Sequence, residues 1–160
     1  MKQLFQSLFN IGIDPNTDQF NIRTIQLVNT LALITSLILL LMTPVLLLSR
    51  VGNPILLNGM MIFSSLAIAM GLVINGLKRY LMAKIYTMLM IVAVISVLSF
   101  LKRGANINHL ALCIPAILVY FCFTYRERRY AYGMVMIISV LFCLLEYRFL
   151  SESSLSLIHI

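Results

Sequence analysis

Five long apolar runs, separated by short polar segments, make up most of the chain. Each run has about 17–25 residues, and an α-helix of that length crosses a hydrocarbon layer of ~30 Å. Backbone groups in lipid find hydrogen-bond partners only within their own segment, so each run must be helical. The connections are short, so neighbouring spans must be antiparallel. We predict spans at Thr24–Leu48, Pro54–Asn75, Tyr80–Leu101, His109–Tyr125 and Tyr130–Tyr147, joined by Ser49–Asn53, Gly76–Arg79, Lys102–Asn108 and Arg126–Arg129.

The segment before the first span has a different pattern. Leu4, Phe5, Leu8 and Phe9 recur at helical spacing, with polar residues between them. Such a helix lies in the membrane interface rather than across the membrane; a disordered start is the alternative. The polar interruptions, and the lack of a small-residue cleavage site after them, argue against a signal peptide. We therefore predict an interfacial helix and cytoplasmic lead-in at 1–23 and a transmembrane helical domain at 24–150.

Composition excludes a water-soluble globule. Hydrophobic residues make up 61% of the chain and charged residues 11%, with a mean hydropathy of +1.00. An ordinary soluble domain is about half apolar and about a quarter charged. The predicted fold class is therefore all-α, a polytopic transmembrane helix bundle in contact with the lipid bilayer.

The net charge of +7 comes from basic residues clustered between the spans. This arrangement is typical of topology anchors and not of a nucleic-acid surface, so we expect no nucleic-acid partner for this segment. Eight bases on one side of the membrane against four on the other predict that the first side is cytoplasmic, so the N-terminus is expected inside the cell. The expected cytoplasmic side holds Lys2, Arg23, Lys78, Arg79, Lys84, Arg126, Arg128 and Arg129. The expected outer side holds Arg50, Lys102, Arg103 and Arg148. The bases that we interpret as topology anchors are Lys78, Arg79, Lys84, Arg126, Arg128 and Arg129.

The last six residues have an unusual explanation. The sequence LSLIHI at 155–160 is the translation of CTG TCT CTT ATA CAC ATC, the start of a transposon mosaic-end adapter. We expect these residues to be an adapter-derived artefact and the reading frame to be truncated near Ser154. His159 is accordingly assigned no function.

Several short motifs resemble a known arrangement. They are LFNIGIDP near the start, IQLVN in the first span, NGLKRYLMAKI between the second and third, RGANINHLAL at the fourth, and FTYRERR after it. Together they resemble the six-helix membrane input regions that bacteria place before cytoplasmic signalling domains. The resemblance implies a sensor or anchor region in the bacterial inner membrane, followed by a histidine kinase, a nucleotide cyclase or a DNA-binding module. It also implies that a sixth helix and the output domain are missing, so no catalytic residue can be assigned.

Two ionisable residues are candidates for sensing. His109 and Glu146 lie equally far from the turn between Glu127 and Arg128, about 28 Å along their helices, so they should be level near the outer interface. Such a pair could sense protons or bind a small polar ligand. The alternative is that neither residue has a sensing role: the histidine lies among the lipid headgroups, and the glutamate pairs with nearby bases. Cys113 lies one helical turn from His109, and Cys143 lies one turn from Glu146. Together the four side chains could bind a metal ion, which is a weaker hypothesis. The alternative is that the two cysteines are ordinary packing residues within the membrane.

Other polar residues in the spans have a simpler interpretation. We expect Asn29, Asn58 and Asn75 to form interhelical hydrogen bonds. Pro44 and Pro115 are expected to kink their helices. The sequence contains no phosphate-binding loop, zinc-protease motif or nucleophile elbow, and it implies no cofactor.

The leading functional hypothesis is the input and anchor region of a signalling protein, acting as a homodimer through its helices and its output domain. A small transporter or channel subunit is the first alternative, and it requires a polar face that continues through several spans. A small structural membrane protein is the second alternative, and it requires a natural C-terminus.

Overall fold

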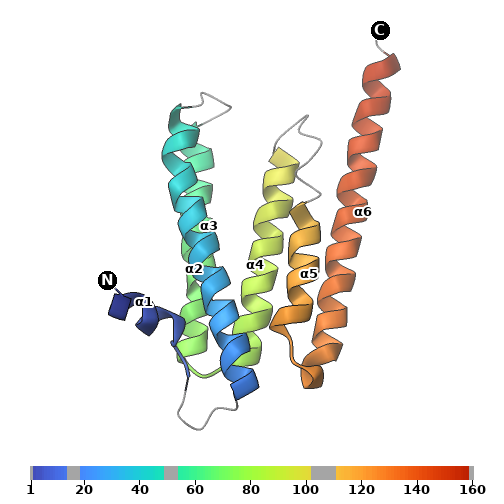
Figure 1. Cartoon of the computed structure of the whole chain (residues 1–160). Coiled ribbons are helices and arrows are strands. Elements are labelled where there is room, and N and C mark those ends of the chain that lie inside the picture. Colours follow the sequence, from blue (N-terminus) through green and yellow to red (C-terminus); the bar gives the residue numbers. More distant parts are fainter. Residues whose placement is uncertain (1, 14–18, 49–53, 102–110, 159–160) are drawn as a thin grey trace. The chain divides into compact units, whose positions relative to one another are not determined.

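The computed structural model describes residues 2–13, 19–48, 54–101 and 111–158, and the regular structure in these ranges is helical (Figure 1). The chain divides into two compact units, Met1–Met90 and Ile91–Ile160, with the boundary inside the fourth helix. The elements are α1 (Lys2–Phe9), α2 (Gln19–Leu48), α3 (Pro54–Gly76), α4 (Tyr80–Leu101), α5 (Cys113–Cys122), the 3-10 turn η2 (Tyr125–Glu127) and α6 (Arg128–Ile158).

Four helices are long and apolar enough to cross a membrane. The apolar stretches are Asn21–Val45 in α2, Ile55–Gly76 in α3, Tyr80–Ser99 in α4, and Tyr125–Phe149, which covers η2 and most of α6. Large apolar side chains on these helices are exposed, among them Phe63 at 72% and Leu66 at 62%. Exposure of this kind is expected where the neighbouring medium is lipid rather than water. The prediction of an all-α multi-span membrane protein is therefore confirmed for the described residues.

The fourth predicted run gives a shorter helix than expected. Within the described residues its α-helix, α5, has 10 residues. An α-helix of that length reaches only about 15 Å, half of the ~30 Å hydrocarbon layer. The beginning of the run, including His109, lies outside the described residues. The described part of the chain thus holds four candidate spans, and the predicted fifth is not shown.

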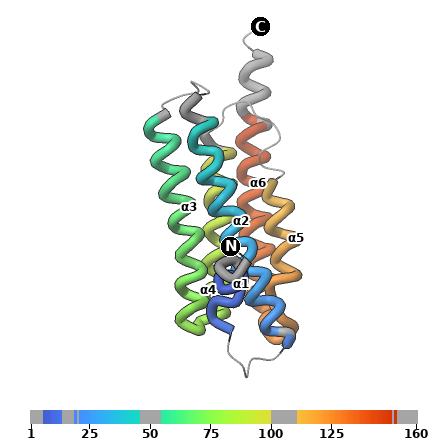
Figure 2. Tube along the Cα trace, turned by 60° about the vertical axis from the view of Figure 1, so that its left-hand side comes forward, coloured from blue at the N-terminus to red at the C-terminus, as the bar shows by residue number. Residues whose placement is uncertain are grey.

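The end of α5 is fixed by a turn that leads into α6. Phe123 has extended backbone angles (φ −101°, ψ 135°), and Thr124 follows in the same region (φ −74°, ψ 166°). The Thr124 N–H donates to the Glu127 carboxylate at 2.9 Å, and the Glu127 N–H donates to the Thr124 carbonyl at 2.9 Å. This Thr-x-x-Glu pattern marks a helix start. The turn ends the apolar run before Tyr125. After it, α6 runs back beside α5 (Figure 2).

The helix α6 is longer than the predicted run, because it continues on both sides of it. It begins at Arg128 and extends to Ile158, so its backbone includes residues 155–158. At its start, the Arg128 guanidinium lies 4.1 Å from the centre of the Tyr125 ring, and that of Arg129 lies 4.8 Å from the Tyr130 ring. Stacking on tyrosine rings suits bases at a membrane interface.

In the first unit, α2 and α3 form an antiparallel hairpin held by polar pairs. Near the start of α2, the Asn75 side-chain amide donates to the Asn29 side-chain oxygen at 2.6 Å. Two turns further along α2, the Ser36 and Ser65 hydroxyl oxygens are 2.8 Å apart, and each hydroxyl also lies within hydrogen-bond distance of the other residue's carbonyl. The predicted interhelical bonding is confirmed for Asn29 and Asn75.

The helix α4 packs closely on α3 in the same unit. Gly71 makes this approach possible, because a Cβ at that position would overlap the Thr87 hydroxyl oxygen. The Tyr86 hydroxyl donates to the Ala67 carbonyl at 2.9 Å, one turn away on α3. A small residue facing a hydroxyl is typical of close helix contacts in membranes.

A third polar position on the hairpin has no such pair. Thr43 and Asn58 lie seven residues beyond Ser36 and Ser65 in opposite directions, so they are level with each other in the hairpin. Yet the Thr43 hydroxyl contacts the carbonyl oxygens of Leu39 and Leu40, in its own helix. Pro44 has no N–H for the Leu40 carbonyl, and Thr43 satisfies that carbonyl instead. Asn58 is 7% exposed, and neither atom of its amide has a partner among the described residues, so its predicted interhelical bond does not form.

Replacing this unpaired amide should stabilise the protein. Asn58→Leu is expected to raise the free energy of unfolding by about 1 kcal/mol, because a buried amide without a partner costs about 1–3 kcal/mol and leucine has a similar size. The measurement is unfolding of the purified chain in mixed micelles of rising SDS content, followed by circular dichroism. A lower unfolding free energy would show that Asn58 has a partner that the described contacts do not reveal.

Candidate functional site

The most developed polar site joins the end of α1 to three long helices. Figure 1 shows α1 set across the end of the hairpin where α2 begins and α3 ends. The Asn29 side-chain amide donates to the carbonyls of Phe9 and Ile11, each at 3.0 Å. The Asn29 oxygen accepts from Asn75, so one asparagine side chain ties α1 to both α2 and α3. Both asparagines are buried, at 0% and 1% exposure, so water competes little for these bonds.

The loop after α1 is held by a third helix as well. The Tyr80 hydroxyl, at the start of α4, donates to the Gly12 carbonyl at 2.6 Å. Gly12 has φ +85°, a left-handed conformation that favours glycine. A Cβ there would overlap the Asn75 carbonyl oxygen and lie 2.9 Å from its carbon. The loop can therefore lie flat against α3 only with glycine at this position. We call Gly12, Asn29, Asn75 and Tyr80 the α1 clamp.

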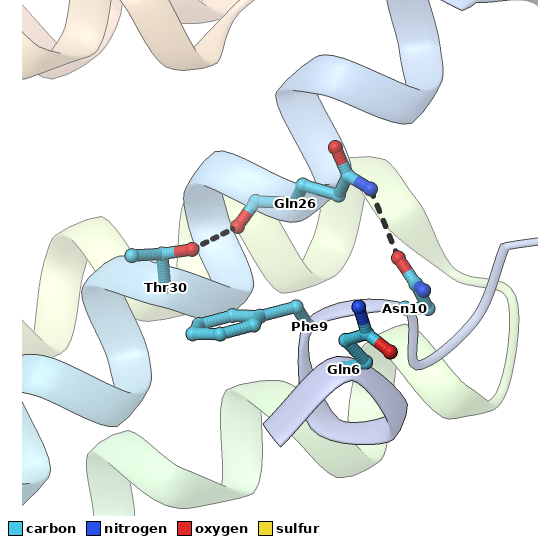
Figure 3. A pocket seen from close by; sticks show the side chains of 5 residues that line it. All are labelled: Gln6, Phe9, Asn10, Gln26 and Thr30. Carbon is cyan, nitrogen blue, oxygen red and sulfur yellow. Dashed lines mark hydrogen bonds between the residues drawn. The ribbon is translucent and has the colours of Figure 1, made fainter. Parts of the chain in front are cut away.

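Beside the clamp, α1 and α2 enclose an open pocket of about 380 Å³ (Figure 3). Its lining consists of Gln6, Phe9 and Asn10 from the first segment and Gln26 and Thr30 from α2. The Gln26 amide donates to the Asn10 side-chain oxygen at 2.9 Å, and the Thr30 hydroxyl donates to the Gln26 carbonyl at 2.7 Å. All five lining residues are uncharged, so this pocket offers amides, one hydroxyl and one aromatic ring.

The residues predicted to sense or to bind metal lie in the second unit. Cys113 and Cys143 are exposed free thiols, and Glu146 is half-buried. His109 lies outside the described residues, so the level His109–Glu146 pair stays a prediction. Within the ranges that the structure describes, no three His, Cys, Asp or Glu side chains come together in a way that could hold a metal ion. The four-residue metal hypothesis therefore also stays a prediction.

The predicted anchors differ in their surroundings. Lys78 and Arg79, in the turn between α3 and α4, are exposed, as are Arg126, Arg128 and Arg129 before and at the start of α6. Lys84, one turn into α4, is only 2% exposed. A lysine buried in a span is unusual, since charged groups in lipid regions are costly. Its burial distinguishes it from the other five anchors, whose predicted role stays a prediction.

Reasoning from the sequence did not identify the α1 clamp. The sequence indicates no role for Gly12 or Tyr80, and it predicts bonds of the asparagines only between spans. The available signal was the pairing of a short amphipathic segment with a following glycine in NIGIDP, which allows a left-handed turn. The hydrogen-bond acceptors are the backbone carbonyl oxygens of Phe9, Ile11 and Gly12, and no sequence pattern indicates which carbonyls accept a bond.

Comparisons of this chain with protein families, with curated proteins and with solved structures give no match.

Proposed function

We propose that this chain is the membrane input and anchor region of a bacterial signalling protein, with its N-terminus and its α1 clamp on the cytoplasmic side. The α1 clamp is the observation that supports this function best. A simple anchor needs only apolar spans. Here two bonds from Asn29 and one from Tyr80 join an amphipathic segment to α2 and α4. A buried bond from Asn75 to Asn29 adds α3 to this arrangement.

The clamp makes the first helix and the bundle move together. A change in the lipid interface around α1 alters the forces on the α2–α3 hairpin, and a change in helix packing alters the position of α1. A signal that favours one packing over another shifts the population of the two by its difference in free energy. In the proposed protein, this shift passes to a cytoplasmic output domain such as a histidine kinase or nucleotide cyclase.

The first test is the gene from which the chain derives. We expect its reading frame to continue past codon 154, through a further apolar span, into a kinase, cyclase or DNA-binding module. In that full-length protein, Gly12→Ala should change the output activity about fivefold at equal protein level, because about 1 kcal/mol of differential stability shifts a two-state equilibrium by that factor. Gly59→Ala is the matched control, since a Cβ there meets nothing within 4 Å.

Two results would contradict the proposal. One is a stop codon soon after codon 154 in the source gene, with no further span. The other is an output activity that is the same in the wild-type protein, Gly12→Ala and Gly59→Ala.

A further inference from the structure

We infer that the pocket between α1 and α2 is a binding site for an uncharged, hydroxyl-bearing ring, such as a sugar. This inference does not depend on the proposed signalling function. It follows from the hydrogen-bonding groups that the five lining residues leave available, from the aromatic ring among them and from the position of the pocket beside an amphipathic helix.

The available groups are both donors and acceptors. Asn10 and Gln26 use one amide oxygen and one N–H on each other, which leaves the Asn10 amino group and the Gln26 oxygen (Figure 3). Thr30 uses its proton on the Gln26 carbonyl, so its oxygen can still accept. The exposed Gln6 amide has no side-chain bond among the described residues. The pocket thus presents two amino groups and three acceptor oxygens that can serve a ligand.

This mixture matches hydroxyl groups better than ions. A phosphate or carboxylate brings only acceptors, and it would face the oxygens of Gln6, Gln26 and Thr30 without a cation among the described lining residues. An ammonium group brings only donors, and it would face the amino groups. Each hydroxyl of a sugar both donates and accepts, so neighbouring hydroxyls can satisfy an amide at both its ends.

Phe9 and the size of the pocket restrict the ligand further. The phenyl ring lies between α1 and α2 in Figure 3, where it offers an apolar surface to the C–H face of a sugar ring. A volume of about 380 Å³ is near the lower end of ligand pockets, which hold about 300–1,000 Å³. One ring fits this space better than a long chain of sugars.

Two sources could supply such a ring, a glycolipid headgroup or a free sugar. The test uses the full chain in nanodiscs of phosphatidylethanolamine and phosphatidylglycerol, with part of the phosphatidylethanolamine replaced by glucosyl diacylglycerol. Retained lipid is measured by native mass spectrometry. We expect preferential retention of the glucosyl lipid, reduced about fivefold by Gln6→Ala, since one lost hydrogen bond changes affinity by about that factor.

The control variant is Ser7→Ala, because Ser7 is exposed, neighbours Gln6 and does not line the pocket. It should retain the glucosyl lipid as the wild-type chain does. Adding millimolar methyl glucoside distinguishes the sources: displacement of the lipid identifies the ring alone as the ligand, and no displacement identifies the glycolipid. Equal retention of both lipids by the wild-type chain, or equal glycolipid retention by Gln6→Ala and wild type, would overturn the inference.

Discussion

Asn29→Leu is expected to lower the free energy of unfolding by about 2–3 kcal/mol, the largest loss among the substitutions considered. The change removes three hydrogen bonds, to the carbonyls of Phe9 and Ile11 and from the amide of Asn75. Hydrogen bonds in membrane proteins contribute about 0.6–1 kcal/mol each, and the partners that remain are left unpaired. The measurement is unfolding in mixed micelles with SDS, with hydrogen exchange across residues 6–13 to show release of α1.

The same substitution elsewhere provides the control. Asn58→Leu exchanges the same side chains at a buried site with no hydrogen bond, and it should stabilise the protein. If the free energy of unfolding falls in Asn29→Leu and rises in Asn58→Leu, the loss at Asn29 is due to its hydrogen bonds and not to the replacement of asparagine by leucine as such. If Asn29→Leu were as stable as the wild-type chain, with unchanged exchange in residues 6–13, the described clamp would be wrong.

Gly12→Ala should lower the free energy of unfolding by about 2 kcal/mol. A left-handed alanine costs about 1–2 kcal/mol relative to the usual conformations, and its Cβ would overlap the Asn75 carbonyl oxygen. The loop must then move away from α3, which lengthens the bond from Tyr80. Faster hydrogen exchange at Gly12 and Ile13, without change in the α3 interior, would show that the loop alone has moved.

Gly59→Ala is the appropriate comparison for this variant as well. Gly59 lies within α3, where an added methyl group meets no neighbour within 4 Å. Alanine favours a helix over glycine by about 0.5–1 kcal/mol, so this variant should be slightly stabilised. An equal loss in both variants would point to a general sensitivity to alanine and would contradict the special role of Gly12.

The sequence predicts the long helices well because lipid leaves the backbone no alternative. Long apolar runs become α2, α3, α4 and α6, whatever their detailed packing. The fourth run shows the limit of this argument. The turn after it lies close to the predicted connection Arg126–Arg129, at η2 and the start of α6. The apolar run nevertheless gives an α-helix of only 10 residues within the described part of the chain, which hydropathy alone does not predict.

The candidate site could be predicted only in part. Asparagines within spans are expected to bond between helices, and Asn29 and Asn75 do so. Asn29, Ser36 and Thr43 recur every seven residues along α2, as Ser65 and Asn58 do along α3, and we call this row the polar seam. Reasoning from the sequence did not predict the bond between its two serines. The attachment of α1 is not visible, because it depends on the φ angle of Gly12 and on backbone carbonyls.

The polar seam gives the α2–α3 hairpin unequal stiffness along its length. Hydrogen bonds hold the two helices together at the α1 end, between Asn29 and Asn75, and again at the middle, between Ser36 and Ser65. At the far end, Thr43 is occupied by its own helix beside Pro44, and Asn58 has no bond that would resist separation. The two helices should therefore separate most easily beyond the pair of Ser36 and Ser65, at the end of the hairpin away from the α1 clamp. Thermal motion should grow toward residues 43 and 58, and a ligand that acts on this hairpin would meet least resistance there.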